Sequence, residues 1–278
     1  MIRLDDTYRS RAAPPGSARY WSWLFSHPEA RAPLLGVFAL LAEWRAATNP
    51  AVDAAVAQTK LLWWRDEMQR LAQRAPLHPI SRLLGSLPGA AEIDFAPLAQ
   101  AVGAASAQVG GVPIERGALL PAHAQDLIGG PLLIAAQLGA DAAEASPGLR
   151  DCAAALAHGE YLARALADYR RDAGFGRIAF PIDELLERSI GNDDLCAPAP
   201  APGLAAYLAE TRAAAARSFA RAAAALEPPE RARHRGLLVL AALGGHHLRT
   251  HRPPYAEDVR LQDIYFAWRT ARTASCAR

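Results

Sequence analysis

Cysteine is scarce in this chain of 278 residues, and the three present, Cys152, Cys196 and Cys276, are scattered. An odd number without ligand-like spacing argues against a disulfide framework and a zinc site, and favours a reducing compartment. No apolar run reaches about 18 residues, so we expect no membrane-spanning helix. The acidic, polar N-terminus does not resemble a signal peptide. We therefore expect a cytoplasmic protein, with contact at the periphery of the inner membrane left open.

Lysine is nearly absent, since Lys60 is the single lysine among 30 basic residues. Such an arginine bias is typical of a GC-rich genome. The formal net charge is only +2, which does not favour a nucleic acid as partner. The chain also lacks a Gly-x-Ser-x-Gly nucleophile motif, a P-loop and a dinucleotide-binding glycine motif. The sequence therefore does not indicate a serine hydrolase, a P-loop nucleotide-binding protein or a dinucleotide-binding protein.

Alanine is abundant, aromatic residues make up 7%, and β-branched runs are few, so the composition favours helix throughout. We expect a kink or break at Pro131 because proline lacks the backbone N–H that a helix interior needs. The pattern predicts one all-α bundle of roughly eight to ten helices. Periodicity and breakers place these helices over residues 28–47, 51–74, 80–87, 95–109, 115–139, 148–173, 181–188, 203–226, 229–251 and 258–273.

Two aspartates close one of the predicted long helices. Asp168 and Asp172 are four residues apart and share one helix face, where like charges repel and mildly destabilise the helix. A basic neighbour, a metal ion or plain solvation can compensate such a pair. Gly174 and Gly176 then end the helix, and Pro181 prevents an immediate restart. The pair is a candidate metal site, with a solvated helix end as the simpler alternative.

Residues 60–67 form a second distinctive stretch and read Lys-Leu-Leu-Trp-Trp-Arg-Asp-Glu. Trp63 and Trp64 point about 100° apart on a helix, so one can be buried while the other lies at an interface. Lys60 and Arg65 can face anionic groups, and the two acidic residues that follow can neutralise them. The alternative is an ordinary helix with a tryptophan core and surface ion pairs.

Three histidines, His246, His247 and His251, gather near the end of a predicted helix. His247 and His251 are four residues apart, a spacing that can chelate a metal, but no third ligand lies nearby in the sequence. We therefore interpret the group as a solvated or capping cluster at a helix C-terminus. The isolated histidines are interpreted as mostly structural; they are His123, His158 and His234.

The segment around the aspartate pair resembles the second aspartate-rich motif of the squalene/phytoene synthase family. That motif reads roughly Asn-x-x-Arg-Asp-x-x-Glu-Asp-x-x-x-Gly-Arg-x-x-x-Pro. The matching positions are Asp168, Asp172, Gly176, Arg177 and Pro181. The departing positions are Arg164 for the asparagine, Ala167 for the arginine and Arg171 for the glutamate. Both aspartates are thus retained, but their surroundings differ from the family's pattern.

Further segments extend the resemblance over nearly the whole chain in the family's order; they are residues 20–31, 60–67 and 258–269. The stretch 60–67 resembles a signature of bacterial members, and also one in related assembly factors of the respiratory NADH dehydrogenase. The family's first aspartate-rich motif should fall within residues 42–49, where only Glu43 aligns well. Arg45 and Ala46 stand where that motif has aspartates, which is the most consequential departure.

The resemblance implies an isoprenoid-synthase-like all-α bundle with a central cavity, as a single squalene/phytoene synthase-like domain over residues 1–278. It implies a prenyl diphosphate ligand of the farnesyl or geranylgeranyl type, with Mg²⁺ held by Asp168 and Asp172. Magnesium would bridge diphosphate oxygens to these carboxylates. The substrate-binding residues would be Lys60, Arg65, Arg177 and Arg45, the last because arginine can pair directly with a phosphate although it repels magnesium.

Three functional hypotheses remain. The first is a prenyl transferase of isoprenoid biosynthesis, or a binder derived from one, and the retained aspartates with Gly176 and Arg177 favour it. The second is a catalytically inactive member that serves as an assembly or interaction factor with a protein partner, and the missing first motif favours it. The third is that the aspartates form a solvated helix end in a degenerate fold.

Overall fold

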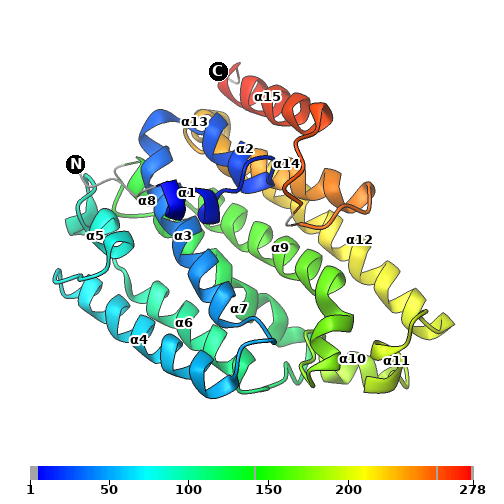
Figure 1. Cartoon of the computed structure of the whole chain (residues 1–278). Coiled ribbons are helices and arrows are strands. Elements are labelled where there is room, and N and C mark those ends of the chain that lie inside the picture. Colours follow the sequence, from blue (N-terminus) through cyan, green and yellow to red (C-terminus); the bar gives the residue numbers. More distant parts are fainter. Residues whose placement is uncertain (1–5, 141, 255, 277–278) are drawn as a thin grey trace.

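A computed structural model describes residues 6–140, 142–254 and 256–276, and none of these residues lies in a β-strand. The predicted all-α fold is therefore confirmed (Figure 1). The longer helices are α3 (Arg31–Ala47), α4 (Ala54–Ala72), α6 (Ala96–Val109), α8 (Gly130–Ala140), α9 (Pro147–Gly174), α12 (Pro202–Ala224), α14 (Arg235–Arg249) and α15 (Leu261–Cys276). The shorter ones are α1 (Asp6–Ala12), α2 (Ala18–Phe25), α5 (Pro79–Gly85), α7 (Leu120–Ala124), α10 (Ile182–Glu187), α11 (Asn192–Cys196) and α13 (Pro228–Arg233).

The helix at the centre of the bundle is α9, which runs through the middle of the molecule in Figure 1. It packs against α12, α14 and the segment that precedes α8. On another side lies α3, whose side chains from Leu34 to Trp44 are mostly buried all round the helix, as is typical of a helix inside a bundle. The site described below lies among these helices because their polar side chains face one another across a shared interior.

Local sequence signals fix the ends of the helices that carry the site. Ser146 caps α9 by accepting a hydrogen bond from the backbone N–H of Leu149, and the cap of α4 is Asp53. At its other end, α9 closes with bonds from the N–H of Gly176 to the carbonyl of Ala173 and from the N–H of Arg177 to that of Asp172. Gly176 has a φ of 71°, a left-handed conformation that glycine adopts without strain.

The structure corrects several predicted boundaries. The predicted helix 229–251 is divided at His234 into α13 and α14, and the predicted loop 191–203 contains α11. The estimate of eight to ten helices was too low because several short helices, among them α1, α2 and α11, show too little periodicity to be recognised. The predicted kink near Pro131 is a π-helical segment, Gln125–Gly129, which joins α7 to α8 directly before that proline.

Two short 3-10 turns, Pro28–Ala30 and Gly117–Leu119, precede α3 and α7, and a third, Ala90–Glu92, precedes α6. No helix among the described residues is both long and apolar enough to cross a lipid bilayer.

Candidate functional site

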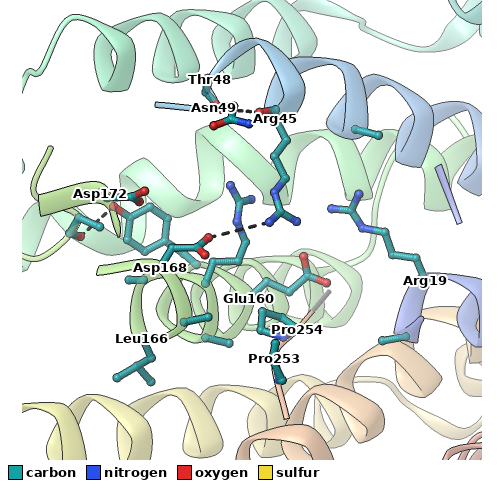
Figure 2. A pocket seen from close by; sticks show the side chains of 18 of the residues that line it. Arg19, Arg45, Thr48, Asn49, Glu160, Leu166, Asp168, Asp172, Pro253 and Pro254 are labelled. Carbon is teal, nitrogen blue, oxygen red and sulfur yellow. Dashed lines mark hydrogen bonds and ion pairs between the residues drawn. The ribbon is translucent and has the colours of Figure 1, made fainter. Parts of the chain in front are cut away.

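A cavity of about 1320 Å³ opens among α3, α9, α12, α14, the segments 10–19 and 251–254, and Glu257. Its polar wall comes from α3 and α9, whose charged side chains face each other across the space (Figure 2). Apolar lining comes mainly from α9, α12 and α14, through Tyr161, Leu166, Phe219, Leu240 and Leu248. The cavity therefore combines a charged region and an apolar region in one space.

The two aspartates at the end of α9 line this cavity, and neither points freely into water. Their side chains are 17% and 22% exposed for Asp168 and Asp172. One Asp168 oxygen lies 3.2 Å from a guanidinium nitrogen of Arg171 and 3.9 Å from one of Arg45. Asp172 lies 3.0 Å from Arg171. The aspartates are thus inside the cavity and paired with arginines at the same time.

The facing helix, α3, brings Glu43 and Arg45 to the same cavity. Arg45 extends from α3 toward Asp168 on α9, as Figure 2 shows. Glu43 is turned to another partner, because its carboxylate accepts a hydrogen bond of 3.2 Å from Arg11 of α1. Where two acidic motifs would face each other in the family's pattern, this chain therefore has an arginine–aspartate pair between α3 and α9.

Cations outnumber carboxylates in the cavity lining. The basic lining residues are Arg11, Arg19, Arg45, Lys60, Arg164, Arg171, Arg177, Arg212 and Arg252, and the acidic ones are Glu43, Glu160, Asp168, Asp172 and Glu257. Burial raises the pKa of the Asp172 carboxyl, Arg171 opposes this shift, and Asp168 adds to it. Because basic side chains are in excess around these two carboxylates, the lining attracts an anion more readily than a metal cation.

Magnesium does not fit the side chains as they are arranged. Within the described parts of the chain, no group of three or more His, Cys, Asp or Glu side chains is placed to hold a metal ion. Asp168 and Asp172 are the two carboxylates predicted as ligands, and guanidinium groups contact both of them. A metal ion there would have to displace Arg171 and would stand in the field of Arg45.

Of the other predicted substrate-binding residues, some line the cavity and one does not. Arg177 lines the cavity, and its guanidinium donates a hydrogen bond of 2.7 Å to the carbonyl of Thr48, which ties the end of α9 to the end of α3. Lys60 is an exposed residue of α4 that also lines the cavity. Arg65 is exposed on the same helix and is not among the lining residues. The role predicted for Arg65 stays a prediction without geometric support.

The sequence interpretation missed part of the polar wall. Glu160 and Arg164 lie on α9 and line the cavity together with Asp168 and Asp172. These four residues recur every fourth position, which places them along one side of the helix. This regular spacing of charged residues along α9 was the signal that could have found them. Other missed residues come from distant segments and carry no such signal; among them are Arg19, Arg212 and Arg252.

Phe219 shapes the apolar part of the cavity. Its ring fits between two glycines, because a Cβ at Gly159 on α9 would lie 3.0 Å from it and one at Gly244 on α14 would lie 2.5 Å from it. Side chains at these two positions would therefore clash with the ring. The small residues thus let α9, α12 and α14 approach closely while leaving apolar space beside Phe219.

The stretch 60–67 has a structural role. Trp64 is buried and Trp63 is 44% exposed, as the 100° offset allows. Glu67 is fully buried rather than a surface partner of Lys60 or Arg65. Its carboxylate accepts hydrogen bonds from the backbone N–H groups of Leu77 and His78 and from the hydroxyl of Ser81. Glu67 therefore fastens the loop before α5 to α4 and is not among the residues lining the cavity.

The histidine cluster is only partly solvated, because His251 alone of the three is exposed, and among the described residues it includes no group placed to hold a metal ion. His246 and His247 are buried, and His247 lies 3.2 Å from the buried carboxylate of Asp263 on α15. Burial, assisted by Arg252, lowers the pKa of His247 to about 4, so the ring is neutral at pH 7. Arg252 forms an ion pair with Asp263. These residues join α14 to α15 beside the cavity.

Comparison with known proteins gives a consistent result. The chain resembles a dehydrosqualene synthase solved with a ligand (TM-score 0.64, 14% identity, 92% of this chain and 90% of that one). It also resembles squalene synthase HpnC from Alicyclobacillus acidocaldarius (TM-score 0.67, 16% identity, 84% of this chain and 89% of that one). None of the curated protein sequences matches this chain significantly. The family model for squalene/phytoene synthase matches residues 13–264, and the chain therefore belongs to the squalene/phytoene synthase family.

Proposed function

We propose that this protein binds a prenyl diphosphate of the farnesyl or geranylgeranyl type in the cavity between α3, α9, α12 and α14. The observation that carries the proposal is the union of a cation-rich wall and an apolar region in one space of about 1320 Å³. The wall suits a diphosphate because guanidinium groups donate paired hydrogen bonds to phosphate oxygens. The apolar region beside Phe219 and Leu240 suits a hydrocarbon tail.

Binding of a non-hydrolysable farnesyl diphosphate analogue, measured by calorimetry, tests this function. Arg45→Ala removes a guanidinium that faces Asp168 across the cavity, and we expect the Kd to rise about 10- to 100-fold because a hydrogen bond to a charged group is lost. Arg217→Ala on α12 is the matched control, since this arginine is exposed and is not among the lining residues. Absence of binding by the wild type at millimolar ligand would refute the proposed function.

We further expect no head-to-head condensation product from farnesyl diphosphate. Ionisation of two diphosphates calls for a metal cluster between two acidic motifs, whereas this chain has Arg45 and Ala46 in place of the first motif's aspartates. Incubation with radiolabelled farnesyl diphosphate, magnesium and a reductant, followed by chromatography of the organic extract, measures this. Squalene or a related thirty-carbon product from the purified protein would restore the transferase hypothesis.

An assembly or interaction factor is the second candidate function, and the ion pair between Arg45 and Asp168 favours it. This pair joins the two helices that would otherwise hold a reactive centre, so the fold is maintained without a metal cluster. Affinity capture from the native host, followed by mass spectrometry, tests this function, and a partner retained equally by wild type and Arg45→Ala would support it. Contact with the membrane periphery stays a prediction.

A further inference from the structure

We infer that the diphosphate is bound directly by arginines, without a divalent metal ion, and that Asp168 competes with the ligand for them. This inference rests on the proposed function and specifies how the same cavity recognises its ligand. It departs from the sequence-based hypothesis, in which Asp168 and Asp172 hold Mg²⁺.

The first step of the argument is the position of Asp168. One of its oxygens lies within 3.2 Å of Arg171 and 3.9 Å of Arg45, which belong to α9 and α3. Two guanidinium groups from different helices thus converge on one anionic oxygen inside the cavity. A phosphate oxygen can take the same place, because guanidinium geometry suits a phosphate as well as it suits a carboxylate.

The second step is the charge that surrounds this point. Arg177 and Arg164 line the same wall, and Lys60 lines the cavity at an exposed position. Asp168 brings one negative charge to this point and a diphosphate brings about two to three, so the ligand compensates these cations more completely than Asp168 does. Arrival of the ligand is therefore expected to release Asp168 from Arg45 and to place phosphate oxygens between α3 and α9.

The third step concerns the metal ion itself. Mg²⁺ requires six oxygen ligands in a near-octahedral arrangement and gives up its water reluctantly. Asp168 and Asp172 would supply two of these ligands only after both had left Arg171. The charge of the displaced arginine would then stand beside the metal. The positive neighbours that would bind a diphosphate are thus the ones that disfavour magnesium.

Neutralising the aspartates distinguishes direct binding by arginines from binding through magnesium, because the two mechanisms predict opposite changes in the Kd. In Asp168→Asn, removal of one negative charge beside Arg45 and Arg171 is expected to lower the Kd for the farnesyl diphosphate analogue about fivefold or more. Asp172→Asn, which loses a charge paired with Arg171, is expected to act in the same direction and less strongly. In a magnesium-based site both variants would bind more weakly or not at all.

The calorimetric titrations are made with excess EDTA and again with excess Mg²⁺, using the analogue and, as a second probe, inorganic diphosphate. The inference requires that wild type binds the analogue in EDTA with a Kd within about threefold of that in magnesium, allowing for complexation of the free ligand by the ion. Weak binding of inorganic diphosphate in EDTA, lost in Arg45→Ala, would confirm that the arginines recognise the charged group. Circular dichroism melting curves verify that the asparagine variants are folded.

The two failures are distinguishable. Binding that disappears in EDTA and in Asp168→Asn overturns the inference but leaves the prenyl diphosphate function standing, with magnesium as the link. No binding of the analogue by any variant, with or without magnesium, overturns the function itself. Binding in EDTA that Asp168→Asn weakens also overturns the inference, because the carboxylate would then contribute to ligand binding.

Discussion

Replacing Glu67 by alanine is expected to lower the free energy of unfolding by about 3 kcal/mol or more, since several buried donors lose their acceptor at once. Glu67 is fully buried on α4. Its carboxylate accepts hydrogen bonds of 2.8 and 2.7 Å from the N–H groups of Leu77 and His78, a further bond from the hydroxyl of Ser81, and one of 2.8 Å from Arg70. Urea denaturation followed by circular dichroism measures the change.

The neighbouring acid provides a matched control for this prediction. Asp66 lies on the same helix and is exposed, so Asp66→Ala is expected to leave stability nearly unchanged. Equal losses in both variants would contradict the structural role assigned to Glu67. A second check is the proposed binding of the farnesyl diphosphate analogue, which should be the same in wild type and folded Glu67→Ala because Glu67 is not among the residues lining the cavity.

The same carboxylate also implies a pH dependence. Burial acts to raise the pKa of Glu67, but hydrogen bonds from Ser81, His78 and Arg70 outweigh it, and the net pKa lies below the usual value of 4.5. Because the folded-state pKa is depressed, the stabilisation is present in full above the unfolded-state pKa. It is lost as the pH falls from about 4.5 through the lower folded-state value. Below about pH 4.5, the free energy of unfolding should therefore fall less steeply with decreasing pH in Glu67→Ala than in wild type.

The second large effect is expected at Asp263, the buried carboxylate of α15. Asp263 is 0% exposed and forms an ion pair with Arg252, which is 6% exposed. Asp263→Ala would leave a buried guanidinium with a reduced set of partners, and we expect a loss of about 3–5 kcal/mol in the free energy of unfolding. Thermal and urea denaturation measure this loss, and limited proteolysis should show earlier cleavage between α14 and α15.

Asp258, the exposed partner of Arg252, provides a control that separates the effect of burial on stability from the effect of charge. Asp258 also pairs with Arg252, at 2.8 Å, but its side chain is 55% exposed. Asp258→Ala is therefore expected to change stability little, because solvent screens an exposed pair. In the double variant Arg252→Met with Asp263→Leu, much of the stability lost in Asp263→Ala should return. Similar losses at Asp258 and Asp263 would show that the buried network has no special role.

Residues 60–67 show that a recognisable motif does not reveal the partners of its own buried acid. The sequence interpretation placed Lys60 and Arg65 near anionic groups and let the following acids neutralise them. In the structure, Glu67 accepts bonds from a loop ten and more residues later in the chain. No local pattern could reveal this, because those donors reach Glu67 only when α5 has packed against α4.

The histidine cluster shows the same limitation. His246 and His247 lie in the last turns of α14, where a sequence pattern suggests a solvated helix end. They are buried because α15 returns and packs on α14, bringing to them Asp263, which lies sixteen residues after His247 in the chain. Whether a polar helix end is exposed depends on what later segments cover it, and that is a property of the tertiary fold.

The sequence by itself determined the fold class, the family and the position of the aspartate pair at the end of a long helix. Each of these follows from local patterns, which are helical periodicity, caps and breakers, and the spacing of a motif. Only the tertiary structure decided the partners of Asp168 and Asp172. Arg45 is more than a hundred residues away in the chain and meets Asp168 because α3 and α9 border one cavity. Long-range electrostatic pairs depend on how helices pack, so the charge of the site became visible only in three dimensions.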